Sequence, residues 1–133
     1  MKKLSTRSLG RQGEDLAVQF LERKGYQILE RNYNTPFGEI DLIALWNTPQ
    51  EAKRLVFVEV KMRRTQEFGY PEQSVTAKKL RHLILACQDY LQEHPMEDAE
   101  WQIDVLSIEM GIRTKITHLE NITVSLDPFI GDQ

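Results

Sequence analysis

Two strand-like stretches decide the fold of this chain: GEIDLIA at residues 38–44 and LVFVEVK at residues 55–61. Both are apolar and rich in β-branched residues, and the segment between them contains the Asn, Thr, Pro and Gln typical of a turn. The pattern predicts an antiparallel hairpin. Because side chains alternate faces along a strand, Glu59 and Lys61 are expected on one face and the neighbouring valines on the other.

Charged residues stand inside these apolar strands. Asp41 lies in the first, and Glu59 lies in the second with Lys61 two residues further on. Burying an unpaired ionised carboxylate is costly, so the two acids require a cation, a partner or a proton. A divalent hard cation with oxygen ligands meets that need. Phosphodiester hydrolysis uses the same parts, a cation to neutralise the phosphate and an ammonium group or base to orient a water.

The length and composition predict one domain. A chain of 133 residues with 41% hydrophobic content is long enough for one compact core and short for two. We expect a single domain over residues 1–133, with its core at about 8–119 and a tail at about 120–133. No run is long enough for a bilayer and the N-terminus lacks the apolar stretch of a secretory signal, which predicts a cytoplasmic protein without membrane association. Cys87, the single cysteine, is expected in a helix core.

Hydrophobic periodicity and turn signals predict the order α-β-β-β-α-β with a further strand at the end. The predicted helices span residues 9–24 and 76–93, the second with Thr76 as N-cap, and the predicted strands span 26–32, 38–44, 55–61, 101–108 and 113–119. A turn is expected at 34–38, a surface loop at 62–71, and an extension of the last strand at 121–126. This order is typical of an α/β domain with a mixed central sheet flanked by helices.

Charge is distributed unevenly along the chain. Residues 1–81 contain 15 Lys and Arg against 10 Asp and Glu, or +5, and residues 82–133 contain 2 against 10, or −8. A polyanion could dock on the basic part, although solvated charges can also segregate without a function. The expected phosphate contacts are Arg63, Arg64, Lys78 and Lys79. Basic side chains in the first turn of the second helix oppose its dipole, a cost that a nearby anion or the site's own carboxylates would offset.

Other acids adjoin the two strand carboxylates. Glu14 borders the buried stripe of the first helix, where it either points into the molecule or is an ordinary first-turn acid. Glu39 shares a strand face with Asp41 and either joins the site or pairs with an arginine. Asp104 is expected to be a hydrogen-bonded structural acid. The three histidines, His82, His94 and His118, lack a metal-ligand spacing among themselves and are expected in structural or solvated positions.

These residues in this order resemble a known group of enzymes. Glu14 in the first helix, Asp41 in the second strand and Glu59-Val60-Lys61 in the third look like the PD-(D/E)XK nuclease superfamily. Within it, the chain is similar from about residue 10 to 108 to the YraN-like uncharacterised bacterial proteins, close in layout to archaeal Holliday-junction resolvases. Ile40 stands where the superfamily has the proline that names its motif.

The resemblance implies a restriction-endonuclease-like fold and a set of site residues. Asp41, Glu59 and the backbone carbonyl of Val60 would bind Mg²⁺ or Mn²⁺, Lys61 would position the attacking water, and Glu14 would assist the metal or the water. The leading hypothesis is a Mg²⁺-dependent endonuclease acting on DNA, including branched or otherwise structured DNA. The alternatives are a nucleic-acid-binding module without efficient cleavage and a protein-interaction domain with a buried ion-pair network. A homodimer is left open.

Overall fold

The structure of the protein is a computed structural model, which describes residues 6–64, 76–96 and 98–122. The elements are α1 (Thr6–Lys24), β1 (Gln27–Thr35), β2 (Gly38–Trp46), β3 (Arg54–Arg64), α2 (Ala77–Glu93), β4 (Glu100–Met110) and β5 (Lys115–Leu119). The order α-β-β-β-α-β-β confirms the predicted α/β domain. The predicted loop beyond residue 64 and the predicted tail beyond residue 122 lie outside the described residues.

The strands form one mixed sheet in the order β1-β2-β3-β4-β5. Neighbours are antiparallel except for β3 and β4, which run parallel over the whole length of both strands. The β2–β3 hairpin confirms the prediction from residues 38–44 and 55–61. A parallel pair needs a crossover connection, and α2 lies in the connection between β3 and β4.

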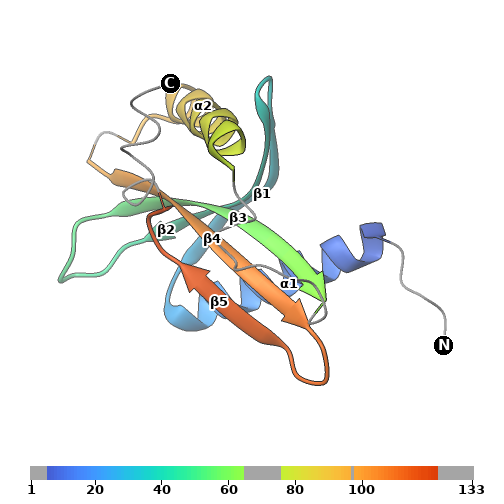
Figure 1. Cartoon of the computed structure of the whole chain (residues 1–133). Helices are drawn as coiled ribbons and strands as arrows, with labels where there is room; N and C mark the ends of the chain where they lie inside the picture. Colours follow the sequence, from blue (N-terminus) through green and yellow to red (C-terminus); the bar gives the residue numbers. More distant parts are fainter. Residues whose placement is uncertain (1–5, 65–75, 97, 123–133) are drawn as a thin grey trace.

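The two helices cover opposite faces of the sheet (Figure 1). Ala17 and Leu21 of α1 pack in one buried cluster with Val56 and Val58, and the apolar side of α2 packs in another with Phe57. Since the odd and even positions of β3 enter different clusters, the predicted alternation of faces is confirmed. Glu59 and Lys61 therefore lie on the α2 face, and the fully buried Cys87 belongs to that same core, as expected.

Two boundaries depend on side-chain hydrogen bonds. Thr76 caps α2 as predicted, because its hydroxyl oxygen accepts from the backbone N–H of Lys79 at 3.1 Å. The first strand is longer than predicted and the turn after it is shorter. Thr35 donates its hydroxyl to the carbonyl of Gly38 at 2.7 Å and accepts from the N–H of Phe37 at 3.0 Å, which closes the turn tightly. Gly38 has a φ of 133°, a conformation that favours glycine.

Neither helix in the described part of the chain combines the length and the apolar character that a membrane span requires.

Candidate metal and catalytic site

The site forms where the sheet opens between β2 and β3. The described pairing of these strands ends at Leu42 and Val58, whereas β3 continues beside β4 as far as Arg64. We call this point, where β2 and β3 separate, the fork. Here the backbone N–H of Val60 donates to Oδ2 of Asp41 at 2.8 Å, and not to a backbone carbonyl of β2. The hydrogen bond fixes the Asp41 carboxylate against the strand that carries Glu59.

Glu59 is 7% exposed and is contacted by two ammonium groups. Its Oε1 atom lies 3.3 Å from Nζ of Lys61 on the same strand and 2.8 Å from Nζ of Lys79 on α2. The capped first turn of α2 therefore brings Lys79 to the site's carboxylates, as the dipole argument from the sequence anticipated. Lys79 was expected to contact nucleic acid, and here its ammonium group is engaged by Glu59.

The pKa values of the two lysines move in opposite directions. Burial and the neighbouring Lys79 lower the pKa of Lys61, and Glu59 opposes that change. For Lys79, burial alone would lower the pKa, but the hydrogen bond and the charge of Glu59 outweigh it and the pKa is raised. Lys79 thus holds its proton more strongly than an ordinary lysine, whereas Lys61 releases its proton more easily.

Asp41 is not compensated in the same way. Burial and the nearby carboxylate of Glu59 raise the pKa of Asp41 to about 7, against the lowering effect of the Val60 hydrogen bond. Both lysines form their ion pairs with Glu59, whereas the charge of Asp41 acts on Lys79 without an ion pair between the two side chains.

Glu14 lies beside Asp41 and is held in place by β1. Its Oε1 atom accepts from Nδ2 of Asn32 at 2.8 Å and lies 3.8 Å from the guanidinium of Arg31. Glu14 and Asp41 line a common cavity of about 170 Å³ and the charge of Glu14 contributes to the raised pKa of Asp41. Of the two alternatives for Glu14, the inward-pointing acid is the one found.

A glycine allows this approach of α1 to the sheet. A side chain at Gly13 would collide with Met62 of β3, so the absence of one lets the helix turn that carries Glu14 sit directly over the strand.

Glu39 connects the cavities around the site. It is exposed, lines a cleft of about 290 Å³ together with Asp41 and Glu59, and also lines a groove of about 730 Å³ together with Glu14. The cleft contains the two strand acids, and the groove contains Arg31 as well as Glu14. Both alternatives for Glu39, joining the site and pairing with an arginine, therefore stay open.

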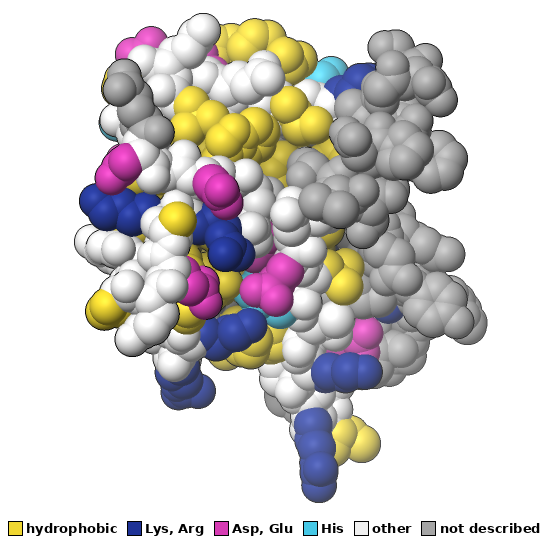
Figure 2. All heavy atoms as spheres, turned by 90° about the vertical axis from the view of Figure 1, so that its left-hand side faces the viewer, with side chains coloured by type: hydrophobic (Ala, Val, Ile, Leu, Met, Phe, Trp, Pro, Cys, Tyr) yellow, Lys and Arg dark blue, Asp and Glu magenta, His cyan; other side chains and the backbone are white. Residues whose placement is uncertain are grey.

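The residues expected to contact phosphate differ in exposure. Arg63 is only 14% exposed and lies 3.5 Å from Glu109, whereas Arg64 and Lys78 are exposed. Figure 2 views the molecule from the side on which the β2–β3 connection lies, and there positive and negative side chains are interspersed. Ion pairs near this connection join Lys53 to Asp98 at 3.4 Å and Arg54 to Glu51 at 3.6 Å. Of the four residues expected to contact phosphate, Arg64 and Lys78 are thus the exposed ones.

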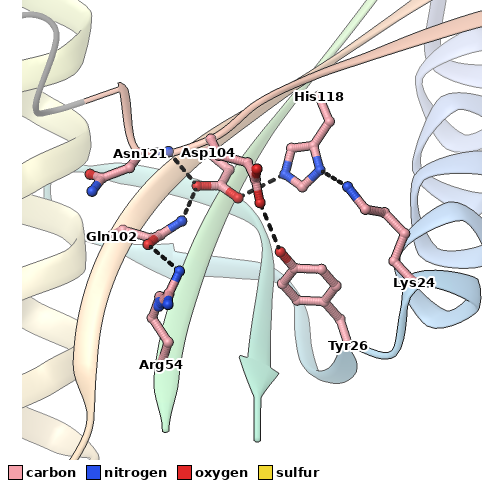
Figure 3. A network of polar contacts seen from close by, with 8 residues as sticks. Lys24, Tyr26, Arg54, Gln102, Asp104, His118 and Asn121 are labelled. Carbon is pink, nitrogen blue, oxygen red and sulfur yellow. Dashed lines mark hydrogen bonds and ion pairs between the residues drawn. The ribbon is translucent and has the colours of Figure 1, made fainter. Parts of the chain in front are cut away.

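A second polar cluster lies on the α1 side of the sheet and is shown in Figure 3. Among the described residues, Asp104, His118 and Glu120 place carboxylate and imidazole ligand atoms within 4.8 Å of one another. The fully buried Asp104 already accepts from His118 at 2.7 Å and from Gln102 and the N–H of Asn121 at 2.8 Å each. The other ring nitrogen of His118 lies 2.8 Å from Nζ of Lys24. These contacts fasten β4, β5 and α1 together, in agreement with the structural role expected for Asp104.

Sequence reasoning missed the residues that hold Glu14. Arg31 and Asn32 lie in a strand, and only their proximity to α1 in the fold connects them with the site. Asn32 has a φ of 53°, a backbone conformation that asparagine tolerates better than most residues. No pattern in the sequence predicts this conformation at residue 32.

Fold and site together define a class: a single α/β domain with a mixed five-stranded sheet whose fork carries two carboxylates and a lysine. Residues 13–108 match the family described as Uncharacterised protein family UPF0102. The chain belongs to this family, and the resemblance to the YraN-like proteins is confirmed.

Relatives in this family match most of the chain. A UPF0102 protein of Syntrophomonas wolfei is 45% identical over 117 residues, which is 86% of this chain and 96% of that protein. A UPF0102 protein of Caldicellulosiruptor saccharolyticus is 36% identical over 119 residues, 90% of this chain and 97% of that protein. Among solved structures, SfsA of Pyrococcus furiosus in complex with Ca²⁺ is 18% identical with a TM-score of 0.38; the match covers 87% of this chain and 64% of that one.

Proposed function

We propose that this protein is a divalent-metal-dependent endonuclease that hydrolyses phosphodiester bonds in DNA, in particular branched or otherwise structured DNA. The observation that carries the proposal is the Asp41 carboxyl group, whose pKa burial and the charge of Glu59 raise to about 7, beside the buried Glu59, which pairs with Lys61 at 3.3 Å. Hydrolysis of a phosphodiester requires carboxylates that bind a metal ion and a nearby cationic group such as a lysine. The likeness of the motifs to the PD-(D/E)XK superfamily supports the same activity.

The donor set fits Mg²⁺ or Mn²⁺. Asp41 and Glu59 offer carboxylate oxygens at the fork, and the backbone carbonyl of Val60 is the third ligand that the resemblance implies. These are oxygen ligands of the kind that hard divalent cations prefer. A bound cation would relieve the carboxylate repulsion that raises the pKa of Asp41. It would also supply charge neutralisation on the phosphate and acidify a water.

The chain's own residues would complete the reaction centre. Lys61, with its lowered pKa, would orient the attacking water and stabilise the charge that develops on the phosphate. Glu14, which shares a cavity with Asp41, would assist by accepting a hydrogen bond from a water near Asp41. Arg64 and Lys78 would contact neighbouring phosphates, because both are exposed beyond the site.

The test is a pair of measurements on the wild-type protein. Isothermal titration with Mg²⁺ and Mn²⁺ measures metal binding without any assumption about the substrate. Incubation with linear duplex, single-stranded, flapped and four-way-junction DNA then measures cleavage. We expect one divalent ion per site and cleavage that depends on it. Absence of metal binding contradicts the proposal, whereas metal and DNA binding without cleavage of any substrate favours the non-catalytic binding module.

Lys79 is expected to compete with the metal for Glu59. Its ammonium group lies 2.8 Å from the Glu59 oxygen that would become a metal ligand. Replacing Lys79 by methionine removes that competing cation while keeping most of the length of the side chain. The affinity for Mn²⁺ should therefore rise about tenfold, as measured by isothermal titration.

The matched control is Lys78→Met, which removes the same charge from the adjacent, exposed position. It should change the Mn²⁺ affinity by less than about twofold, because exposed charges are screened by solvent and salt. An equal gain in both variants would mean that net charge matters and that the contact with Glu59 does not.

A further inference from the structure

The cleft of about 290 Å³ extends beyond the carboxylates to which the metal was assigned. Asp41 and Glu59 form its floor. One wall is the β1–β2 turn, with Phe37 and Gly38, and the other is the side of α2 that carries His82, Leu83 and Ala86. Figure 1 shows this turn and α2 on the same side of the sheet. A phosphate held at the carboxylates would have its attached nucleoside within reach of this space.

Phe37 lies in the turn between β1 and β2. It is 45% exposed, so part of its aromatic ring is open to a ligand. The two hydrogen bonds of Thr35, to Phe37 and Gly38, fix the backbone on both sides of it. The backbone that carries the aromatic ring is therefore tied to Thr35 at the edge of the cleft, an arrangement that suits stacking on a flat ligand.

The opposite wall has the chemistry of a base-binding surface. The exposed imidazole of His82 and the ammonium group of Lys79 line this wall, and the almost fully buried Leu83 and Ala86 lie behind them. A flat group with an apolar face and a polar edge fits between such walls. At about 290 Å³ the cleft is at the lower end of the size of small-molecule sites, which suits one nucleotide better than a base pair.

We propose that this cleft is a subsite for one unpaired nucleobase next to the phosphate that is cleaved. The substrate would then be DNA with an unpaired nucleotide at that position, in a single strand, a flap or a junction, in preference to continuous duplex. A base of an intact duplex must be unpaired and unstacked before it can enter the cleft. For a base that is already unpaired, this free-energy cost is small. This inference rests on the proposed nuclease function and specifies its substrate.

The experiment compares Phe37→Ala with Ile112→Ala in the background of Lys61→Ala, so that DNA stays intact in the presence of Mg²⁺. Ile112 is a matched control because it is fully exposed in the β4–β5 turn, far along the chain from the cleft. The probes are a single-stranded oligonucleotide, a duplex with a single unpaired 2-aminopurine, and the same duplex fully paired. Binding is followed by fluorescence anisotropy and by the emission of 2-aminopurine.

We expect Phe37→Ala to weaken binding of both probes with unpaired bases by about tenfold, since stacking on one aromatic side chain is lost, and to abolish the change in 2-aminopurine emission. Affinity for the paired duplex should change less than about twofold, and Ile112→Ala should change none of these values. Phe37→Leu, which keeps an apolar side chain of similar size, should behave as Phe37→Ala. Equal losses on paired and unpaired probes, or no loss with either Phe37 variant, would overturn the proposal.

The two proposals fail differently. If the wild-type protein binds no divalent ion but unpaired DNA still depends on Phe37, the nuclease assignment is wrong and the nucleobase subsite stands. If metal binding and cleavage occur without any dependence on Phe37, the subsite is wrong and the nuclease assignment stands.

Discussion

Replacing Lys61 by alanine is expected to lower DNA cleavage by about 100-fold or more while metal and DNA binding remain close to those of the wild type. Lys61 contacts Glu59 at 3.3 Å and would act on the attacking water and on charge that develops only in the transition state. Lys61 competes with the metal for Glu59 less than Lys79 does, because its ammonium group lies farther from the shared oxygen, at 3.3 Å against 2.8 Å, and its pKa is lowered. The measurement is the single-turnover cleavage rate with Mg²⁺, alongside isothermal titration with Mn²⁺ and anisotropy with DNA.

The control for this experiment is Lys115→Ala, which removes the same charge from an exposed position on the edge strand β5. Its cleavage rate should equal that of the wild type. If wild-type and Lys61→Ala preparations cleave at the same rate, the activity does not come from this site, and a contaminating nuclease becomes the simplest explanation.

Replacing Asp41 by asparagine is expected to abolish divalent-ion binding and to leave the fold intact. The amide oxygen can still accept the hydrogen bond from Val60, but the charged ligand is lost. Isothermal titration with Mn²⁺ measures the binding, and circular dichroism confirms the fold. Unchanged Mn²⁺ affinity in a folded Asp41→Asn protein would contradict the metal site.

The same substitution should stabilise the metal-free protein at high pH. The pKa of Asp41 is raised from 3.8 to about 7, so the folded state holds a proton that the unfolded state releases. Wild-type stability therefore declines as the pH rises from about 4 to about 7, by on the order of 4 kcal/mol at most. Asparagine does not titrate and avoids this decline. Urea unfolding without metal should show the variant more stable at pH 8 and similar to the wild type at pH 4.

Asp98→Asn is the control for the stability experiment. Asp98 is 69% exposed and pairs with Lys53 on the surface, so its removal should change the free energy of unfolding by less than about 1 kcal/mol and without the same pH dependence. A gain in stability at pH 8 with both substitutions would point to net charge and not to the burial of Asp41.

The sequence by itself determined the elements and the faces on which their side chains lie. Alternation along residues 55–61 was enough to place Glu59 opposite the valines, because a strand repeats every two residues wherever it is found. Thr76 was recognisable as a cap because the hydrogen bond that it accepts is local. The order of the elements followed from the same short-range signals and from the contrast between helical and strand periodicity.

Only the tertiary structure decided how separate elements meet at the site. Lys79 reaches Glu59 because the crossover helix docks on the face that carries this acid, and Asn32 reaches Glu14 because α1 lies against β1. The raised pKa of Asp41 has the same origin, since burial and the proximity of Glu59 exist only after β2 and β3 pair and then separate. Hydrogen bonds between neighbours in the chain leave a local pattern in the sequence, whereas contacts across the sheet depend on packing that no single segment encodes.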